Sequence, residues 1–439
     1  MARGLVILSE TRSYTISEKI IARDEALITS TMKYRLYPFS VARAKGVLLW
    51  DADGNEYIDF MAVGGAMAAG HGHPVIRKAI ESALDDGIAH PLVCYSHKPA
   101  VELAERLIHL LPGDFKKMVW FGLSGSDAMD FLAKVIPISS KRPRLISFTG
   151  AFHGMTIGSG AISGHAALSK PIPNGHITKA PFPNPKRCSW GPCEQSGCSL
   201  KCLDFLENEI LGVLSPPNET GAIFAEIVQS DSGEIVPPSN FFPALRKLCD
   251  KHGIWLILDE IKTGLGRTGN LFAFEKHGIV PDAVAIAKPL GGGLPISAVV
   301  ARSDIFDADL YTAYTLGGSP LACRSALALL DVIEAENLVE NAAEMGDYLM
   351  TGLKNLMQEH PIIGEVRGEG LLVGVELQNI DDSQQDLTEL ASRLAYRCFE
   401  FGLILLSFGN VIEMTPPLTI NKKQIDQGLD IFRRAIQAG

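Results

Sequence analysis

Hydrophobic positions along the chain follow two alternating patterns. Short, continuous apolar runs rich in β-branched residues predict buried strands, and longer segments with apolar residues three or four positions apart predict amphipathic helices. The apolar runs lie at residues 117–122, 144–150, 220–228, 254–260, 282–288 and 297–302. Helical segments follow two of these runs, at 124–136 and 241–253. Continuous apolar strands that alternate with helices are typical of an α/β fold with a mostly parallel sheet and helices on both faces.

Both ends of the chain break this alternation. Residues 1–33 have a mixed character that predicts an N-terminal helix or arm, and residues 47–60 carry two apolar runs around an Asp-Gly turn, which predicts a hairpin. After about residue 330, long helical segments precede two further apolar runs, a pattern typical of a small α+β domain. We therefore predict a large domain at 61–325 and a smaller domain formed by residues 1–60 and 326–439.

Composition narrows the class of protein. The 439 residues are 46% hydrophobic, enough for a sizeable core, and carry a formal net charge of -10. That charge argues against a nucleic-acid-binding protein, which usually has a basic patch. No apolar run reaches the ~18 residues of a transmembrane helix, and the first apolar run is too short for a signal peptide. We therefore expect a cytosolic protein that acts on small molecules and binds neither nucleic acid nor a membrane.

Polar and aromatic residues gather at the predicted carboxyl ends of the strands, where open parallel sheets bind their ligands. They are Ser124, Gly125, Ser126, Asp127, Phe152, His153, Glu226, Gln229, Asp231, Asp259 and Lys288. Lys288 follows an apolar run, and burial there would lower its pKa and free the amine as a nucleophile or base. The alternative is a lysine that extends its ammonium group to solvent. Pro289 favours extended backbone at Lys288, and the three glycines after it allow a bulky group to approach closely.

Three other features at these strand ends suggest a common ligand. Asp259 ends a strand, where a buried carboxylate needs a cationic partner such as a protonated pyridine nitrogen, although a helix cap or salt bridge would also satisfy it. Ser124–Asp127 form a turn that opens a helix, and this turn can bind phosphate or simply cap the helix. Phe152 can stack on a flat cofactor or belong to the core. With a lysine amine, these features together describe a site for pyridoxal 5'-phosphate (PLP).

Several motifs then resemble the class III aminotransferase family, whose members have the fold of type I PLP-dependent enzymes. In chain order they are SGSDA, FHGMTIGS, LILDEIKTGLGRTG, AVAIAKPLGGGLP, GGSPLAC and EVRGEGLLVGVEL, and this order is typical of the family. The resemblance covers about residues 35–436. It implies PLP as the cofactor, an amine or amino acid as the substrate, and a homodimer or homotetramer with shared active sites.

The resemblance also implies roles for individual residues. Lys288 would bind PLP covalently as the internal aldimine, and Asp259 would keep the pyridine nitrogen protonated. Ile261 and Phe152 would pack on the two faces of the ring. The remaining expected cofactor contacts are Gly125, Ser126 and Asp127 at the phosphate, together with His153, Glu226 and Lys262, and Thr315 would reach the phosphate of a neighbouring subunit.

Within the family, WFGLSGSDAMD, QSDSGEIVPP and GNVIEMTPPLTI resemble the amino-lactam racemase and isoleucine 2-epimerase branch. Racemisation needs an acid–base group across the cofactor from Lys288. Phe152 replaces the tyrosine of the lactam-racemase pattern and cannot transfer a proton, so Asp231 becomes the candidate, unless it is only a structural carboxylate. Glu413 replaces an arginine that many transaminases use to bind a substrate carboxylate, and we expect it to repel one. The prediction is therefore a racemase or epimerase of an amino acid or amino-lactam; the alternative is an aminotransferase that passes the amino group to a 2-oxo acid.

Four of the eight cysteines lie close together, namely Cys188, Cys193, Cys198 and Cys202. Four thiols can hold a structural zinc ion, but their spacing is looser than that of paired CxxC motifs. We therefore expect free thiols in a surface loop and no metal, with a structural zinc ion as the alternative.

Overall fold

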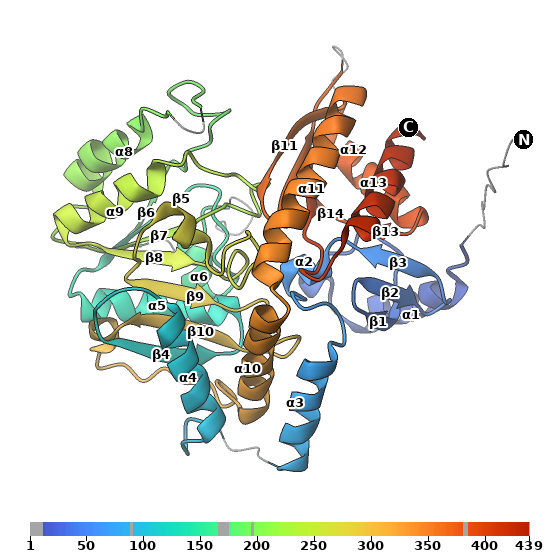
Figure 1. Cartoon of the computed structure of the whole chain (residues 1–439). Helices are drawn as coiled ribbons and strands as arrows, with labels where there is room; N and C mark the ends of the chain where they lie inside the picture. The colour runs from blue at the N-terminus through green and yellow to red at the C-terminus, as the bar shows by residue number, and fades with distance from the viewer. Residues whose placement is uncertain (1–11, 88–90, 166–174, 195–196, 381–384, 439) are drawn as a thin grey trace, which may run out of the picture.

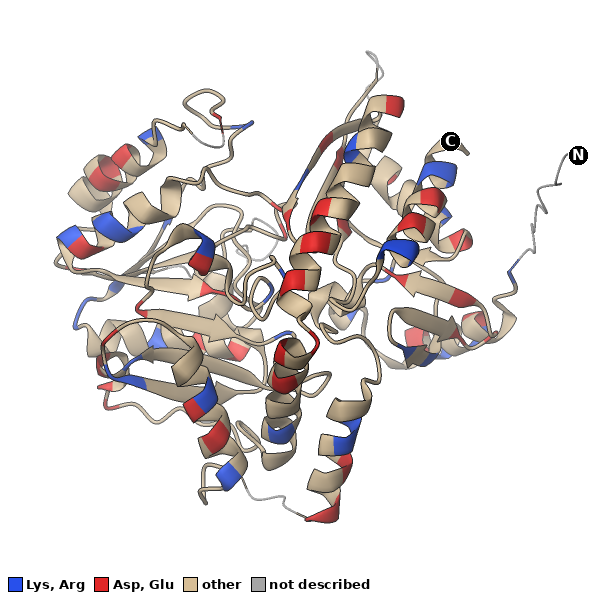
Figure 2. Cartoon of the chain, viewed as in Figure 1, with Lys and Arg blue, Asp and Glu red and all other residues tan. Residues whose placement is uncertain are grey.

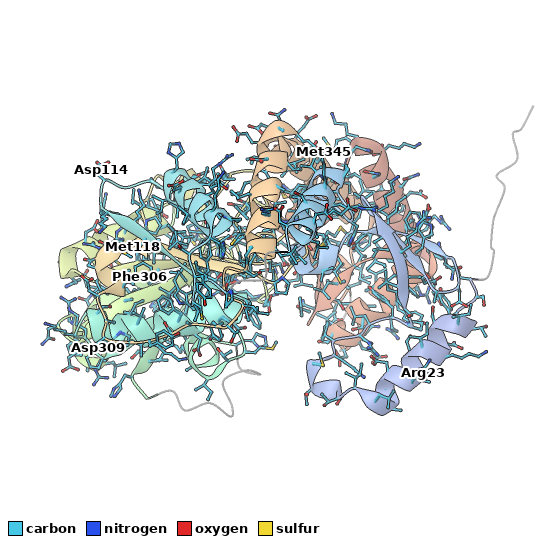
Figure 3. All side chains as sticks on the ribbon, turned by 90° about the horizontal axis from the view of Figure 1, so that it is seen from below. Arg23, Asp114, Met118, Phe306, Asp309 and Met345 are labelled. Atoms are coloured by element: carbon cyan, nitrogen blue, oxygen red, sulfur yellow. The ribbon has the colours of Figure 1, made fainter. Side chains whose placement is uncertain are left out.

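A computed structural model describes residues 12–87, 91–165, 175–194, 197–380 and 385–438. Figure 1 shows a large sheet flanked by helices, and beside it a second region in which the C-terminal third packs against the N-terminal segment. In the side-chain view of Figure 3, Arg23 lies at the opposite end of the molecule from Met118 and Phe306. None of the helices in the described part of the chain is long and apolar enough to cross a membrane.

The large sheet has seven strands in the order β4-β10-β9-β8-β7-β5-β6. Their bounds are β4 Lys117–Gly122, β5 Arg144–Phe148, β6 Ile177–Ala180, β7 Thr220–Glu226, β8 Trp255–Asp259, β9 Ala283–Ile286 and β10 Ser297–Arg302. Strand β10 runs antiparallel to both of its neighbours, and the pairs from β9 to β6 are all parallel. The carboxyl ends of β4, β7, β8 and β9 therefore lie at one edge of the sheet, as the sequence predicted.

Helices cover both faces of this sheet. Ile223 of β7 belongs to the same core as helix α9 (Phe241–His252), whereas the next residue, Phe224, belongs to the core that contains α5 (Gly125–Ser139). Burial on both faces explains why the strands are continuous apolar runs rather than alternating ones. In Figure 2 the charged residues lie mainly on helices and loops, while the strands of the large sheet are mostly uncharged.

Two four-stranded sheets form the second region. Their strands are β1 Val41–Lys45, β2 Leu48–Asp51, β3 Glu56–Asp59 and β13 Leu403–Ile404 in one sheet, and β11 Ile363–Glu369, β12 Leu372–Leu377, β15 Val411–Met414 and β14 Leu406–Phe408 in the other. The predicted hairpin is β2–β3, and it shares its sheet with β13 from the C-terminal part of the chain. The other long helices are α1 Thr15–Leu27, α3 Pro74–Asp85, α4 Lys98–Leu110, α10 Pro320–Ala335, α11 Leu338–Glu359, α12 Leu387–Glu400 and α13 Lys422–Gln437.

Some observed bounds differ from the predicted ones. The predicted strands at 220–228 and 282–288 end earlier, at Glu226 and Ile286, because the backbone turns at the ligand edge. Lys288 consequently lies in a turn beyond β9 rather than in the strand itself. Strand β6 was not predicted, since its sequence ITKA has no continuous apolar run. The predicted domain boundary between residues 325 and 326 falls inside α10, and the division into two domains stays a prediction.

Candidate active site

A cavity lies at the carboxyl ends of β4, β7, β8 and β9. Its walls are formed by Ser124, Gly125, Ser126, Phe152, His153, Gly154, Glu226, Ser230, Asp231, Asp259, Ile261, Lys262, Thr263 and Lys288. All of the catalytic and cofactor-binding residues proposed from the sequence line this cavity except Asp127 and Thr315. Segments more than a hundred residues apart in the chain thus meet at one site, because parallel strands end at one edge.

The start of α5 forms one wall of the cavity. Ser124 caps the helix, and its Oγ accepts the N–H of Asp127 at 3.2 Å. The first N–H groups of a helix have no partner within the helix, so they can bind an anion. Gly125 allows the helix to approach the opposite wall, since a Cβ there would lie 2.8 Å from Cγ2 of Ile261. The Oγ of Ser126 accepts the N–H of Met155 at 3.1 Å and so ties this wall to the segment after Phe152.

Two predicted contacts lie outside the cavity. The carboxylate of Asp127 turns back and accepts the N–H of Leu123 at 3.2 Å, which makes it part of the helix cap. Thr315 is exposed in a turn and does not line the cavity of its own chain. Its expected contact with a neighbouring subunit stays a prediction.

Asp259 is held in place at the centre of the site. Its Oδ2 lies 2.8 Å from Nδ1 of His153, and its Oδ1 accepts the N–H of Ile261 at 3.0 Å. Both side chains are buried, and Nε2 of His153 is buried without a hydrogen-bond partner among the described residues. A buried carboxylate so oriented is suited to a cationic ligand atom in the cavity.

Burial shifts the pKa values of two further groups. Burial, and then the charge of Asp259, raise the pKa of Glu226 well above its ordinary range and so favour its protonated form. Its Oε1 accepts the N–H of Phe152 at 2.9 Å. Burial, and then the ammonium group of Lys262, lower the pKa of Lys288. The lysine that the sequence singled out is therefore buried, and its amine loses its proton more readily than that of an ordinary lysine.

A buried charge cluster closes the cavity on the side of the second region. Nζ of Lys262 lies 2.6 Å from Oε2 of Glu413 and 4.0 Å from Oδ1 of Asp231. Burial raises the pKa of Glu413 and is the largest single influence on it, but the charge of Lys262, together with the hydrogen bonds of Glu413 and the charge of Lys288, makes the net shift downward. Burial and the charge of Glu413 raise the pKa of Glu234 well above its ordinary range. The cluster thus combines the ammonium group of Lys262, the carboxylate of Glu413 and, at Glu234, a carboxyl whose raised pKa favours the protonated form.

This cluster changes two expectations from the sequence. Lys262 lines the cavity, as expected of a cofactor contact, but its ammonium group is engaged with Glu413. The charge of Glu413 is consequently balanced within the protein, and the repulsion expected of a free glutamate is reduced. Glu234 was not identified, because a glutamate before the apolar run at 235–236 gives no sign of burial. Ser230 and Thr263 were also missed, since short polar residues in loops are common.

The four clustered cysteines do not line this cavity and form no disulfide bond in the described part of the chain. Burial and a hydrogen bond with Cys198 raise the pKa of Cys193 to about 12, and burial raises that of Cys202 to about 11. In the ranges that the structure describes, no three His, Cys, Asp or Glu side chains are grouped as the ligands of one metal ion. Free thiols and the zinc alternative both stay predictions.

The residues of the cavity fit PLP. The unpartnered helix start at Ser124–Ser126 suits a phosphate, Asp259 suits a protonated ring nitrogen, and the amine of Lys288 suits a covalent bond to an aldehyde carbon. Phe152 and Ile261 supply apolar surface for a flat ring. The raised pKa of Glu226 disfavours a second negative charge beside that of Asp259.

Known proteins resemble the chain over nearly its whole length. A family model described as Aminotransferase class-III matches residues 29–436. An alanine/serine racemase of Pyrococcus horikoshii is 37% identical over 96% of this chain and 90% of its own length. A 5-aminovalerate aminotransferase of Pseudomonas aeruginosa is also 37% identical, over 95% of this chain and 97% of its own length. The crystal structure of a PLP-bound amine transaminase from an uncultivated Pseudomonas species has a TM-score of 0.86 at 29% identity, and covers 94% of this chain and 97% of that one.

Proposed function

The chain belongs to the class III aminotransferase family, and on that premise we propose that it is a racemase or epimerase that inverts the amine-bearing carbon of an amino acid or amino-lactam. The enzyme is PLP-dependent. One observation carries the proposal for inversion: the carboxylate of Asp231 lines the same cavity as the amine of Lys288. Inversion requires two groups that can transfer a proton at the same carbon, one on each face.

Lys288 is the proton-transfer group on one face. PLP, when bound, withdraws electrons from the amine-bearing carbon and makes its proton acidic. The lowered pKa of Lys288 favours the neutral amine, which can accept that proton and return it. Asp259 would hold the ring nitrogen, and the start of α5 would hold the phosphate, so that the substrate carbon is kept beside the lysine.

Asp231 is proposed as the proton-transfer group on the other face. Lys262 is closer to Glu413, at 2.6 Å, than to Asp231, at 4.0 Å, so its ammonium group leaves the oxygens of Asp231 available to a substrate. Phe152 lines the cavity but has no proton to transfer. Asp231 is partly accessible, with 21% of its side chain exposed, as a group that must contact substrate should be.

The charges around the cavity favour a substrate with an uncharged side chain. Among the described residues that line the cavity none is an arginine, and the one ammonium group besides Lys288 is paired with Glu413. A second, distal carboxylate would therefore have no unpaired cation to bind in this cavity and would lie near Glu413. This supports an amino acid with a neutral side chain or an amino-lactam rather than a dicarboxylic substrate.

Transfer of the amino group to a 2-oxo acid such as pyruvate or 2-oxoglutarate is the second candidate. The 37% identity to an aminotransferase supports it as strongly as the same identity to a racemase supports inversion. Lys288 alone could serve this reaction, because the proton can return from the face on which it was removed. Asp231 would then be a structural carboxylate.

A homodimer or homotetramer with shared sites is proposed for the assembly. Thr315 is exposed and outside its own cavity, and exposed Leu316 follows it in the same turn. A neighbouring subunit that covers this turn would bury the leucine and bring the threonine to a second site. Light scattering on the holoenzyme tests the proposal, and a monomer would contradict it.

The proposed role of Asp231 is tested with the variant Asp231→Asn, which keeps the size of the side chain and removes its basicity. Chiral chromatography of a single enantiomer incubated with the holoenzyme follows inversion. We expect inversion to fall by roughly 10²- to 10⁴-fold, the usual contribution of general acid–base catalysis. The matched control Asp347→Asn, on the exposed face of α11, should keep the wild-type rate. Undiminished inversion in Asp231→Asn contradicts the role of Asp231, and undiminished inversion in Lys288→Ala contradicts that of Lys288.

A further inference from the structure

Asp231 lies in a short loop that closes on itself. An antiparallel bridge between Gln229 and Ile235 forms the base of the loop. Within it the N–H groups of Gly233 and Glu234 both donate to the carbonyl oxygen of Ser230, at 2.8 and 3.1 Å. We call residues 230–234 the Asp231 loop.

The backbone of the Asp231 loop needs support from outside. Gly233 and Glu234 both have positive φ angles, +92° and +53°. Residues other than glycine rarely adopt this left-handed backbone conformation, so Glu234 is held there by its surroundings. Ser232 provides one external contact, through its Oγ, which donates to the carbonyl oxygen of Gly150 at 2.7 Å.

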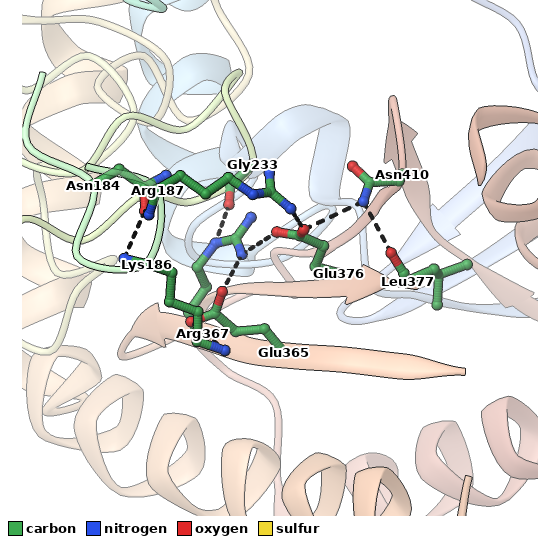
Figure 4. Close-up of polar contacts among 9 residues, drawn as sticks. All are labelled: Asn184, Lys186, Arg187, Gly233, Glu365, Arg367, Glu376, Leu377 and Asn410. Carbon is green, nitrogen blue, oxygen red and sulfur yellow. Dashed lines mark hydrogen bonds and ion pairs between the residues drawn. The ribbon is translucent and has the colours of Figure 1, made fainter. Parts of the chain in front are cut away.

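Arg367 of β11 provides a second external contact. Its Nε donates to the carbonyl oxygen of Gly233 at 2.6 Å, and its side chain is only 12% exposed (Figure 4). The approach is so close that a Cβ on Gly233 would lie 2.9 Å from Nη2 of Arg367. This bond joins the loop that carries Asp231 to a strand 134 residues further along the chain.

Arg367 is itself fixed by two carboxylates of the same sheet. Its Nη1 lies 2.8 Å from Oε2 of Glu365 and 2.5 Å from Oε2 of Glu376. Glu376 also forms an ion pair with Arg187 (Figure 4). Nζ of Lys186 lies 3.3 Å from Oε1 of Glu365. A guanidinium group with paired carboxylates on one edge has a defined orientation, and Nε is left to hold the loop.

We propose that Arg367 is a positioning residue for Asp231: through the carbonyl oxygen of Gly233 it holds the Asp231 loop so that the carboxylate stays at the cavity. The proposal rests on the acid–base role proposed for Asp231. Arg367 does not line the cavity, so it acts on the reaction only through the loop. Displacement of a proton-transfer group by about 1 Å can slow a reaction by roughly 10²-fold.

If only proton transfer on the face of Asp231 is slowed, Arg367 positions Asp231. If proton transfer on both faces is slowed, Arg367 stabilises the protein in general. Exchange of the α-hydrogen with solvent and without inversion needs only Lys288, whereas inversion needs Asp231 as well. If Arg367 positions Asp231, the variant Arg367→Met should lower inversion about tenfold or more and leave exchange without inversion nearly unchanged. A merely structural arginine would lower both rates together.

The experiment compares three variants of the holoenzyme. Arg367→Met removes all donors at this position, and Arg367→Lys keeps the charge beside Glu365 and Glu376 but lacks the Nε donor. Arg187→Met is the matched control, since it also removes an arginine from Glu376 but makes no contact with the Asp231 loop. Hydrogen–deuterium exchange with mass spectrometry follows peptides that span 229–236, and chiral chromatography with mass detection follows inversion and α-hydrogen exchange.

We expect faster amide exchange at 229–236 and a lower ratio of inversion to α-hydrogen exchange in both Arg367 variants, and wild-type values of both in Arg187→Met. Unchanged amide exchange at 229–236 overturns the proposal, and so does a parallel loss of inversion and α-hydrogen exchange. If Arg367→Met does not fold, Arg367→Lys decides by the same two criteria. A wild-type enzyme that inverts no amino acid would contradict the proposed function instead, and the amide exchange would then decide alone whether Arg367 anchors the loop.

Discussion

Loss of the ammonium group of Lys262 should destabilise the protein more than an ordinary surface substitution. Lys262→Met keeps most of the side-chain volume but leaves the carboxylate of Glu413 without its partner at 2.6 Å. The side chain of Glu413 is 1% exposed, and its Oε1 also accepts a hydrogen bond from Oγ1 of Thr415 at 3.2 Å. Removal of one partner of a buried ion pair typically costs about 3–5 kcal/mol.

The size of this effect can be converted into a melting temperature. At about 2 cal/mol/K per residue, the entropy of unfolding for a chain of 439 residues is about 0.9 kcal/mol/K. A loss of about 3–5 kcal/mol then lowers Tm by roughly 3–5 °C. Thermal unfolding of the holoenzyme, at fixed protein and PLP concentrations, measures the shift.

The difference in Tm between the wild type and Lys262→Met should depend on pH. In the wild type the pKa of Glu413 is lowered on folding, so its contribution to stability is present above its ordinary value of 4.5 and is lost as pH falls through the folded value. Without Lys262, the effect of burial is opposed less strongly, and the pKa of Glu413 rises. The carboxyl of the variant can then take up a proton as pH falls, so the gap in Tm should be larger at pH 8 than at pH 5.

A second substitution completes the test. Lys262→Met combined with Glu413→Leu removes both charges, and buried pairs replaced by apolar residues often lose little stability. We therefore expect the double variant to be more stable than Lys262→Met alone. A single variant with the wild-type Tm, or a double variant no more stable than the single one, would refute the argument that Lys262 neutralises a buried carboxylate.

Three further outcomes are expected. Asp259→Asn removes the charge that faces the cavity and should lower turnover by roughly 10²-fold at saturating PLP, measured by steady-state kinetics; an unchanged rate would mean that Asp259 has no electrostatic role. Because the pKa of Lys288 is lowered, reductive labelling of the apoprotein by PLP and borohydride should have its midpoint below the ordinary lysine value of 10.5, and a midpoint at that value would show an unperturbed amine. The cluster of Cys188, Cys193, Cys198 and Cys202 should titrate as free thiols in protein without bound zinc, and stoichiometric zinc in metal analysis would favour the alternative.

The sequence predicted the parts of the molecule that depend on local pattern. The strand at Lys117–Gly122 has the predicted bounds because an apolar run between a charged turn and a glycine has little freedom in where it begins and ends. Asp259, Glu226 and Lys288 meet at one cavity because each lies at or just beyond the carboxyl end of a parallel strand, and parallel strands share the edge at which they end.

Long-range pairings were beyond the sequence pattern. The contact between Lys262 and Glu413 joins residues 151 positions apart, and the local sequence around either residue does not indicate its partner. Glu234 is buried because the loop that carries it has positive φ angles at Gly233 and Glu234, and the sequence SGE at residues 232–234 does not indicate this conformation. The same holds for Arg367, which reaches the Asp231 loop from another sheet. Such contacts depend on how the two regions pack.

The most direct test of the account is the fate of one enantiopure amino acid in deuterated water, with and without pyruvate. Chiral chromatography and mass spectrometry would follow the enantiomers and their α-deuterium. The account predicts that the holoenzyme produces the opposite enantiomer with deuterium at the α-carbon, and that pyruvate is not required. Loss of the amino group only when pyruvate is present, with no inversion in its absence, would contradict the account and identify an aminotransferase.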